Sequence, residues 1–343
     1  MTPLLELRDV TKVYGGGGFL RKRPSVVALD NVTFTIEDNN PTITAIAGES
    51  GSGKTTLAHL LLGHIDQTGG SVRYRGQELT KMRGAERMRF RREVQPIFQD
   101  PFAAFNPFYR VDHVMTMPIK QFGLAKSESE GQRLIVEALE MVGLRPKETL
   151  GRFPHQLSGG QRQRIMIARA LLCRPKVILA DEPVSMVDAS LRATILASLQ
   201  RLNRELGISI IYITHDLTTA YQISDNIIVL YRGSVAEAGS AERVIQDPKH
   251  PYTRLLVSSI PVADRKRRWT GEDLPDMDAP TPRASVGCRF APRCPAVMEM
   301  CWNERPPLYR PDEHRVATCF LYRDKPVLES SDVSEVFADR PVS

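Results

Sequence analysis

The sequence predicts an α/β protein built around a sheet of parallel strands. Through residue 240, short β-rich runs alternate with helical patterns, and this alternation is typical of parallel strands joined by helices. The apolar, β-branched run Ile43–Ala47 leads into a glycine-rich loop, after which leucines recur at helical spacing until Gly63. A strand, a glycine-rich loop and a helix in this order make a common phosphate-binding unit.

Later segments continue this pattern. Three strand-like runs return in the second half, at 177–180, 208–214 and 227–231. A helix is expected over 189–206, because its leucines share one face. Between 101 and 157 the pattern is helical, with a capping box at Ser127 and Glu130 and a stop at Gly143. We therefore expect a helical insertion between two parts of the sheet.

Size and composition are those of a globular protein. The chain has 343 residues, of which 42% are hydrophobic and 25% are charged. It contains no run of about 18 apolar residues, the length that a membrane span needs. Its N-terminus, MTPLLELRDV, lacks the pattern of a secretory signal. We expect a soluble protein that stays in the cytosol.

The positive charge of the chain raises the question of nucleic acid. The net charge is +6 and the pI is about 9.1. However, lysines and arginines are spread along the chain, and the two local clusters, 21–23 and 265–268, lie in stretches flanked by Gly and Pro. We interpret them as solvated loop charge, with contact to a membrane surface or a partner as the alternative. No nucleic-acid partner is expected.

Residues 48–55 read Gly-Glu-Ser-Gly-Ser-Gly-Lys-Thr and match the P-loop pattern G-x-x-x-x-G-K-[ST] without a mismatch. Glycines let backbone N–H groups surround phosphate oxygens at a helix N-terminus, where the helix dipole favours negative charge. Lys54 is expected to contact the β- and γ-phosphates, and Thr55 to bind Mg²⁺. A chance match in a plain glycine-rich turn would occur in about one chain of this length in a hundred.

Two carboxylates, Asp181 and Glu182, directly follow the apolar run 177–180. Because the carboxyl ends of parallel strands form the ligand-binding edge of such a sheet, we expect Asp181 to share the Mg²⁺ with Thr55. Glu182 is a candidate general base for the attacking water. A structural acid at a strand end is the alternative. His215 ends another strand-like run and could meet the γ-phosphate, although a lone histidine there is more often structural.

Residues 157–164 read Leu-Ser-Gly-Gly-Gln-Arg-Gln-Arg and precede a helical pattern. They form a second glycine-rich helix N-terminus and hence a second anion site. This segment resembles the signature motif of ATP-binding-cassette (ABC) ATPases. The resemblance implies that the motif closes on the γ-phosphate of ATP held by another subunit, so that two ATP molecules lie between two chains arranged head to tail.

The resemblance to ABC ATPases assigns roles to further residues. Tyr14 matches the aromatic residue that stacks on adenine, and Gln99 matches the Q-loop glutamine that contacts Mg²⁺ and senses the membrane subunits. His215 matches the switch histidine. Residues 185–188 occupy the D-loop and read Ser-Met-Val-Asp, where the family usually has a sequence closer to Ser-Ala-Leu-Asp. Asp188 is retained and also suits the N-cap of the next helix.

These matches together predict the site. The expected catalytic residues are Glu182 and His215, and those expected to hold Mg²⁺ are Thr55, Gln99 and Asp181. The residues expected to bind ATP are Tyr14, Gly48, Glu49, Ser50, Gly51, Ser52, Gly53, Lys54, Thr55, Thr56, Gln99, Ser158, Gly159, Gly160, Gln161, Asp181 and Asp188.

The resemblance also implies a domain organisation, that of a P-loop ABC ATPase with a parallel-sheet core, an antiparallel β edge, a helical insertion and a small C-terminal cysteine module. The ATP-binding core is expected at 1–100 and 173–260, with the helical subdomain and its signature motif at 101–172. A linker rich in Pro, Asp and Arg, followed by the cysteine module, is expected at 261–343.

Four of the five cysteines lie near the C-terminus, at Cys288, Cys294, Cys301 and Cys319, with the spacing C-x5-C-x6-C-x17-C. In a cytosolic protein such a group suggests a metal or cluster site before disulfides. Four thiolates suit zinc and an iron–sulfur cluster equally well. The spacing lacks the C-x2-C pair common in zinc sites, and the family resemblance favours a [4Fe–4S] cluster. Zinc and four unligated cysteines are the alternatives. Cys173, at an apolar helix end, is expected in the core.

Three segments resemble the ATPases of oligopeptide and dipeptide importers in particular. They are residues 98–107, the run His250-Pro-Tyr-Thr253 with its following helix, and residues 287–295. The resemblance implies that ATP-driven closure of the dimer powers import of oligopeptides or dipeptides, with oligosaccharides, nickel or other solutes as alternatives. A soluble ABC ATPase acting on ribosomes or DNA fits less well, since the chain has one cassette and no sustained heptads. An exporter ATPase is a further rival.

The partners implied by this resemblance are other proteins of a membrane complex. They are two transmembrane permease subunits, which dock near residues 99–109, and a solute-binding protein. The long connection at 15–25 is often seen in one of such an importer's two ATPase subunits, so a second, different ATPase subunit is expected. The chain would then lie peripherally on the cytoplasmic face of the inner membrane.

Overall fold

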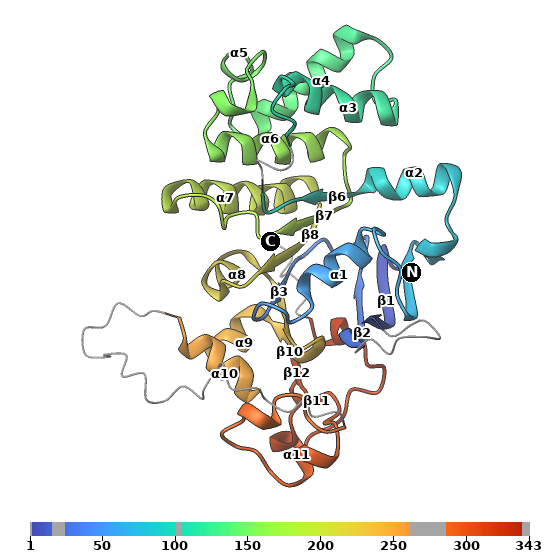
Figure 1. The fold of residues 1–343 in the computed structure, drawn as a ribbon, viewed down its shortest axis with the longest axis vertical. Coiled ribbons are helices and arrows are strands. Elements are labelled where there is room, and N and C mark those ends of the chain that lie inside the picture. The colour runs from blue at the N-terminus through green and yellow to red at the C-terminus, as the bar shows by residue number, and fades with distance from the viewer. Residues whose placement is uncertain (1, 16–24, 101–104, 261–285, 338–343) are drawn as a thin grey trace, which may run out of the picture.

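The computed structural model describes residues 2–15, 25–100, 105–260 and 286–337. In Figure 1 these residues form an elongated molecule, with a helical region at the top, the main sheet in the middle and the cysteine-containing region at the bottom. No helix in the described part of the chain has the length and apolar character needed to span a bilayer. The basic clusters at 21–23 and 265–268, and the predicted linker, lie outside the described residues.

The main sheet has eight strands. In spatial order they are β11 (Tyr309–Asp312), β12 (Arg315–Ala317), β10 (Ser234–Ser240), β9 (Asn226–Tyr231), β3 (Ile43–Ala47), β8 (Ser209–Thr214), β7 (Val177–Asp181) and β6 (Val94–Ile97). The strands from β9 to β6 all pair in parallel, as the sequence predicts. The strands β10, β12 and β11 continue the sheet in antiparallel pairing.

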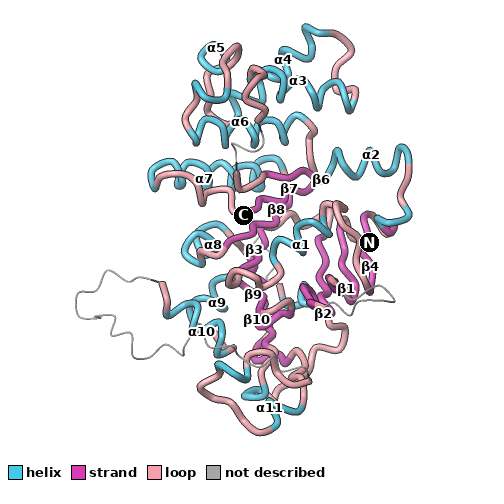
Figure 2. The backbone as a smooth tube through the Cα atoms, viewed as in Figure 1, coloured by secondary structure: helices cyan, strands magenta, loops and turns pink. Residues whose placement is uncertain are grey.

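A second sheet has four antiparallel strands and forms the predicted β edge. In spatial order they are β2 (Val26–Ile36), β1 (Leu5–Tyr14), β4 (Gly69–Tyr74) and β5 (Gln77–Glu78). Figure 2 shows these strands beside the helix α1 (Lys54–Leu61), which follows the P-loop. Apolar side chains of this sheet, of α1 and of the main sheet share one buried cluster, so the second sheet supports the helix that follows the P-loop.

Eleven α-helices occur in the described residues. Besides α1 they are α2 (Gly84–Glu93), α3 (Val111–Phe122), α4 (Glu128–Met141), α5 (Pro146–Thr149), α6 (Gly159–Leu172), α7 (Ala189–Leu206), α8 (Leu217–Ile223), α9 (Ala241–Gln246), α10 (Pro251–Ser258) and α11 (Met300–Asn303). Short 3₁₀ turns lie at Leu79–Lys81, Pro154–Gln156, Ala291–Arg293, Phe320–Tyr322 and Val333–Val336. Helices α3 to α6 form the region at the top of Figure 1, which confirms the predicted helical insertion.

Strand β8 shows why the central strands are apolar throughout. Its residues Ile210 and Tyr212 belong to the apolar cluster that includes helix α7. Its residues Ile211 and Ile213 belong to the cluster that includes helix α1. Because successive side chains of a strand point to opposite faces, a sheet covered by helices on both faces needs apolar residues at every position.

One local prediction is wrong in part. Ser127 caps α4 as expected, since its hydroxyl accepts a hydrogen bond from the Glu130 backbone N–H at 3.2 Å. A capping box also requires the Glu130 carboxylate to accept from the Ser127 N–H. The carboxylate instead accepts from the N–H of Lys126, at 2.7 Å, because the side chain reaches one residue further back along the entering chain.

The C-terminal region is joined to the core through the main sheet. Strand β12 pairs with β10, with Glu237 opposite Ala317 and Gly239 opposite Arg315. A Cβ at Gly239 would lie 2.2 Å from the carbonyl oxygen of His314, and the residue has a φ of 149°, so glycine permits this close approach. The sequence predicts a module beyond a linker and gives no sign of this pairing.

Candidate functional site

The P-loop turns sharply between β3 and α1 and needs glycine at two positions. Gly48 has a φ of 151° and Gly53 a φ of 109°, values that other residues rarely adopt. A Cβ at Gly48 would lie 2.3 Å from the carbonyl oxygen of Leu230, and one at Gly53 would lie 2.6 Å from that of Ala28. Packing against β9 and β2 therefore sets the path of the loop at the N-terminus of α1, where anions bind.

Lys54 is buried at the start of α1. Its Nζ donates to the carbonyl oxygens of Gly48, at 2.7 Å, and Glu49, at 2.9 Å. Burial lowers the pKa of its ammonium group, while the carboxylates of Glu182, Asp181 and Glu49 act in the opposite direction. The lysine charge is thus held inside the loop, beside the helix N-terminus and near three carboxylates.

The other predicted P-loop residues differ in accessibility. Ser50, Gly51 and Thr55 are exposed, Gly53 and Thr56 are half-buried, and Ser52 is buried. The exposed Thr55 lies in the first turn of α1. Thr55 is therefore accessible from solvent.

Glu182 occupies a strained backbone position at the end of β7. Its N–H donates to the carbonyl oxygen of Ile213 at 2.9 Å, so the chain stays attached to β8 one residue beyond the strand. Its φ is 44°, a conformation that costs on the order of 1–3 kcal/mol for a non-glycine residue and is frequent at functional sites. Beside it, burial and then the Glu182 carboxylate raise the pKa of Asp181.

The carboxylate of Glu182 joins three segments of the chain. Its Oε2 accepts from Nε2 of Gln99 at 2.8 Å, and its Oε1 lies 2.8 Å from Nδ1 of His215. These residues follow β6, β7 and β8, which are neighbours in the sheet. The structure therefore brings together three residues that the sequence assigns to catalysis and metal binding.

The signature segment begins α6 with a capping box. The Ser158 hydroxyl accepts from the Gln161 N–H at 3.2 Å, and the Gln161 side chain accepts from the Ser158 N–H at 2.9 Å. A Cβ at Gly160 would lie 1.6 Å from Cδ2 of Leu191, so the absence of a side chain lets α6 contact α7. Figure 1 shows α6 in the upper helical region, away from α1 in the centre. Within this chain, Ser158 to Gln161 therefore lie apart from the P-loop.

The D-loop connects Glu182 to helix α7. The Ser185 hydroxyl donates to the carbonyl oxygen of Glu182 at 3.0 Å. The Asp188 side chain accepts from the Leu191 N–H at 3.0 Å, which confirms the predicted N-cap. Between them Met186 is 57% exposed, so this residue of the D-loop, which departs from the usual pattern, faces solvent.

Tyr14 ends strand β1 with an exposed ring, and Nζ of Lys12 lies 5.1 Å from the ring centroid. An exposed aromatic face can stack on a flat ligand ring. The position is compatible with the predicted adenine contact, which stays a prediction.

The four C-terminal cysteines gather at the bottom of the molecule. The Cys288 N–H donates to the carbonyl oxygen of Cys301 at 2.8 Å, and the Met298 N–H donates to the Cys301 sulfur at 3.5 Å. Burial, and then the other three thiols, raise the pKa of Cys319 to about 11. All five cysteines are free, and Cys173 is buried in the core as expected.

These cysteines do not close a metal site as they stand. Among the residues that the structure describes, no group of three or more His, Cys, Asp or Glu side chains is placed to hold a metal ion. The predicted [4Fe–4S] cluster, and zinc as its alternative, therefore gain no support from the geometry. The thiols share one neighbourhood without forming a ligand shell.

The sequence did not reveal how the cysteine region meets the P-loop. Arg293 forms an ion pair with Glu49, with a distance of 3.0 Å from Nη1 to Oε2. The hydroxyl of Tyr252, in α10, accepts from the Glu49 N–H at 2.8 Å. Both residues lie in segments that carry the importer resemblance, His250-Pro-Tyr-Thr253 and 287–295. The sequence motifs indicate no role for Arg293 and Tyr252, because nothing near them in the sequence predicts a contact with the P-loop.

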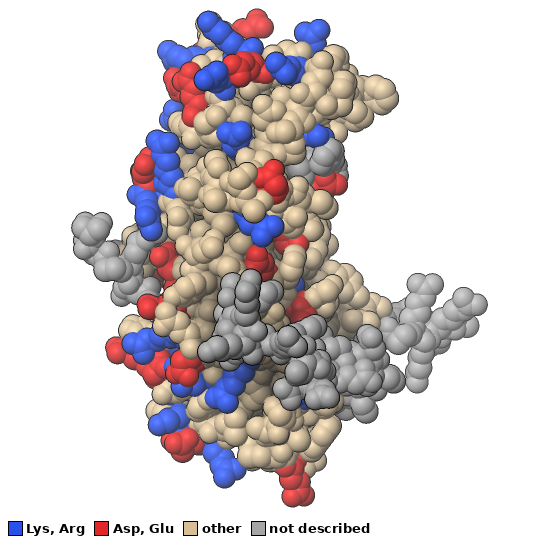
Figure 3. All heavy atoms as spheres, turned by 90° about the vertical axis from the view of Figure 1, so that its left-hand side faces the viewer, with Lys and Arg blue, Asp and Glu red and all other residues tan. Residues whose placement is uncertain are grey.

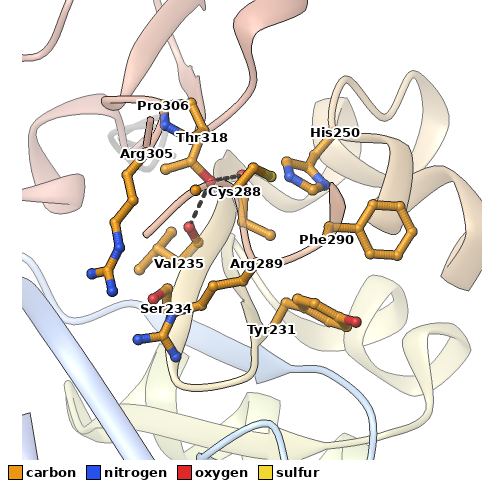
Figure 4. Close-up of a pocket in the computed structure, with 12 residues that line it drawn as sticks. Tyr231, Ser234, Val235, His250, Cys288, Arg289, Phe290, Arg305, Pro306 and Thr318 are labelled. Atoms are coloured by element: carbon orange, nitrogen blue, oxygen red, sulfur yellow. Dashed lines mark hydrogen bonds between the residues drawn. The ribbon is translucent and has the colours of Figure 1, made fainter. Parts of the chain in front are cut away.

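A pocket marks the same junction. It has a volume of about 80 Å³ and lies between the β9–β10 hairpin and the cysteine region. Its lining residues include Tyr231, Val235, Cys288 and Phe290. Figure 4 shows the labelled side chains around it, with Tyr231 below and Phe290 at one side. The lining is mainly apolar, so the pocket forms part of the packing between the two regions.

The surface charge is mixed on the face that Figure 3 shows. Lys and Arg side chains alternate there with Asp and Glu side chains from the helical region to the bottom of the molecule. Interspersed charges do not create the field of one sign that attracts a nucleic-acid backbone.

Two family models match the chain. Residues 29–185 match the model described as ABC transporter. Residues 236–301 match the model described as Oligopeptide/dipeptide transporter, C-terminal region. The second match begins in β10 and ends in α11, so it covers α10 and three of the four clustered cysteines.

Full-length relatives agree with these matches. The chain is 39% identical over 328 residues to YkfD of Bacillus subtilis (strain 168), covering 94% of this chain and 96% of that protein. It is 37% identical over 323 residues to the oligopeptide transport ATP-binding protein OppF of Escherichia coli (strain K12), covering 92% and 95%. Among solved structures, a dimeric post-hydrolysis state of the ATP-binding cassette MJ0796 bound to ADP and Pi matches with a TM-score of 0.61 and 30% identity. That match covers 69% of this chain and 98% of that chain.

Proposed function

The chain belongs to the ATP-hydrolysing subunits of oligopeptide-type ABC transporters, and we propose that Glu182 is the catalytic base with which it powers peptide import. The observation that carries this proposal is the placement of the Glu182 carboxylate between Gln99 and His215, at the edge of the sheet where the P-loop also lies. A carboxylate held at both oxygens is oriented before the water arrives, which lowers the cost of proton transfer.

The other site residues bind different parts of the nucleotide. In our proposal the P-loop from Gly48 to Thr56 surrounds the phosphates, and Lys54 neutralises charge that develops on them. Tyr14 stacks on the adenine. His215 orients Glu182 and contacts the γ-phosphate through its second nitrogen.

Magnesium fits the same edge. Asp181 is buried beside the like-charged Glu182, and both effects raise its pKa, so a cation there would relieve an unfavourable pair of charges. Asp181, Thr55 and Gln99 supply the oxygen ligands that Mg²⁺ prefers. When bound, the ion supplies positive charge to the phosphate oxygens.

The signature segment provides the second half of a composite site. Ser158 to Gln161 lie at the N-terminus of a 14-residue helix, a position that attracts anions, yet they lie apart from this chain's own P-loop (Figure 1). We propose that they bind the γ-phosphate of ATP on a second ATPase subunit, in a head-to-tail pair. Asp188 and the exposed Met186 would then face that subunit.

The rest of the complex follows from the family. We propose two transmembrane permease subunits, a solute-binding protein and a different second ATPase subunit, with the chain on the cytoplasmic face of the inner membrane. The permeases would dock near residues 99–109, in which Phe108 is 86% exposed and Tyr109 is 51% exposed. Large exposed apolar side chains are typical of a docking surface. Oligopeptides or dipeptides are the proposed cargo, with oligosaccharides as the alternative.

For Cys288, Cys294, Cys301 and Cys319 we propose a [4Fe–4S] cluster, with zinc as the alternative. The support is chemical: four thiols share one neighbourhood, and burial raises the pKa of Cys288, Cys294 and Cys319, so a cation would stabilise their thiolates. When bound, the cluster would supply a cross-link between these chain segments. Small movements of the thiols are required, since they form no ligand shell as placed.

The test is purification of the tagged chain from membranes, with mass spectrometry of its partners and iron, zinc and visible absorption measured on the same sample. Two membrane subunits and a second ATPase would support the importer, and about four irons per chain would support the cluster. Ribosomal or DNA-repair partners without membrane subunits would contradict the transport role. If an anaerobically prepared sample contained neither iron nor zinc, this result would contradict both the cluster and zinc, its alternative.

A further inference from the structure

Arg293, in the cysteine region, holds the P-loop residue Glu49 with two parallel hydrogen bonds. Its Nη1 lies 3.0 Å from Oε2 and its Nη2 lies 3.1 Å from Oε1 of that carboxylate. The two residues are 244 positions apart in the sequence. Such a two-point contact is the strongest form of the arginine–carboxylate pair and also fixes the orientation of both groups.

The arginine is fixed in place by aromatic rings. Its guanidinium carbon lies 5.8 Å from the ring centroids of both Tyr231 and Phe290, within the range of a cation–π contact. These two rings meet edge to face, with centroids 5.2 Å apart and an interplanar angle of 89°, and Figure 4 shows both at the pocket. The Arg293 side chain is only 8% exposed, so it has little freedom to leave Glu49.

Glu49 is held at its backbone as well. Its N–H donates to the hydroxyl of Tyr252 at 2.8 Å, and its carbonyl oxygen accepts from Nζ of Lys54 at 2.9 Å. The side chain paired with Arg293 therefore belongs to a residue that directly contacts the P-loop lysine. A movement of the Glu49 carboxylate can therefore shift Lys54, because the Glu49 backbone is hydrogen-bonded to Nζ of this lysine.

The charge of Glu49 matters for a site that binds phosphates. Its carboxylate is one of the three that act on the pKa of Lys54, so its field reaches the centre of the P-loop. ATP brings several negative charges to the same place, and an unpaired carboxylate there would repel them. The ion pair with Arg293 cancels this field, and the half-buried setting limits screening by solvent.

We propose that Arg293 is a positioning residue of the ATP site: it neutralises and orients the Glu49 carboxylate, so that ATP affinity depends on the cysteine region. The inference rests on the ATP site assigned above. It concerns the chain's own residues and holds whatever occupies the cysteines. Arg293 touches neither ATP nor Mg²⁺ in this proposal and acts only through Glu49.

The test is equilibrium ATP binding by the full-length chain at low salt, about 50 mM. Arg293→Ala should weaken binding by about tenfold, since it leaves the carboxylate unpaired. Arg293→Lys should keep part of the affinity, because it retains the charge without the two-point geometry. The matched control is Arg305→Ala, in the same region, since Arg305 pairs with Asp30 rather than with the P-loop. This control should bind ATP like the parent chain.

A second variant separates charge from folding. In Glu49→Gln/Arg293→Ala the repelling carboxylate is gone, so ATP affinity should return to within about threefold of the parent. The loss in Arg293→Ala should also shrink at about 0.5 M salt, because removal of the arginine opens the Glu49 carboxylate to screening by added ions. A merely structural arginine would show neither the recovery nor the salt effect.

Unchanged ATP affinity in Arg293→Ala, or a loss that persists in the double variant, would overturn the proposal. Lys54→Ala, measured beside it, shows which assignment has failed. If Lys54→Ala loses ATP and Arg293→Ala does not, only the role of Arg293 is wrong. If both bind ATP normally, the ATP site itself is misassigned.

Discussion

Nδ1 of His215 lies 2.8 Å from Oε1 of Glu182. An ionised carboxylate only accepts hydrogen bonds, so a neutral His215 paired with it carries its proton on Nδ1. Gln99 donates to the other oxygen at the same distance, 2.8 Å. The carboxylate is therefore held from two sides, by residues that follow two different strands.

Glu182→Gln should retain ATP binding and lose turnover. The amide has the size of the carboxylate but cannot take a proton from water, so hydrolysis should fall by about 10²- to 10⁴-fold, while the ATP dissociation constant should change by less than about threefold. Phosphate release and equilibrium binding measure the two quantities. Glu205→Gln, on the exposed face of α7, is the matched control and should match the parent. Hydrolysis within a few-fold of the parent would remove Glu182 from the base role.

Asp181→Asn should raise the Mg²⁺ requirement. Asp181 is buried beside Glu182, and an amide is a weaker Mg²⁺ ligand than a carboxylate. The Mg²⁺ concentration for half-maximal hydrolysis should rise about tenfold at fixed ATP. Asp66→Asn changes an exposed aspartate outside the site and should leave the titration unchanged. An identical Mg²⁺ titration for Asp181→Asn would exclude this residue from the metal site.

Glu237 and His250 should give opposing pH dependences of stability. Burial raises the pKa of Glu237 from 4.5 to about 7 and lowers that of His250 from 6.5 to about 3. Between pH 6.5 and 4.5 the folded protein keeps a proton on Glu237 that the unfolded chain releases, so this residue adds stability as the pH falls. The unfolded chain protonates His250 while the folded protein does not, so this residue removes stability as the pH falls.

Single substitutions at these two positions should separate the two contributions to the change of the free energy of unfolding with pH. Relative to the parent chain, the free energy of unfolding of His250→Gln should rise as the pH falls from 6.5 to 4.5, and that of Glu237→Gln should fall, each by on the order of 1–2 kcal/mol. Urea unfolding at several pH values measures this. Both variants will be less stable overall, so the slopes are compared rather than the absolute values. Parallel slopes in the two variants would contradict the opposite protonation of this pair.

Gly160→Ala should destabilise the contact between α6 and α7. The new methyl group would lie 1.6 Å from Cδ2 of Leu191, and the side chain of Leu191 would have to move, at a cost of about 1–3 kcal/mol. The double variant Gly160→Ala/Leu191→Ala has room for the methyl group and should recover part of the loss. Urea unfolding of both variants tests this, with Gly159→Ala as control, because its Cβ meets no atom nearer than 3.9 Å.

Several parts of the site are local in the sequence and could be predicted from it. The P-loop needs residues that adopt positive φ at Gly48 and Gly53, and the caps at Ser158 and Asp188 pair a side chain with an N–H three residues ahead. Interactions this short are set by the chain itself. The same locality explains why the bounds of α7 were predicted correctly from the spacing of its leucines.

Contacts between distant segments could not be predicted in this way. The motifs indicated that Gln99, Glu182 and His215 belong to one site. The structure adds that β6, β7 and β8 are neighbours in the sheet, so that the Glu182 carboxylate contacts both Gln99 and His215. The cysteine spacing suggested a ligand shell, and the described thiols do not form one.

The sequence by itself determined the family, the parallel sheet and the identity of the phosphate-binding loop, because each depends on patterns a few residues long. The tertiary structure decided that β12 joins the main sheet beside β10 and that Arg293 pairs with Glu49 across 244 positions. Such pairs form when the packing of whole elements repays the entropy of closing a long loop. That balance is a property of the folded molecule and cannot be predicted from sequence patterns a few residues long.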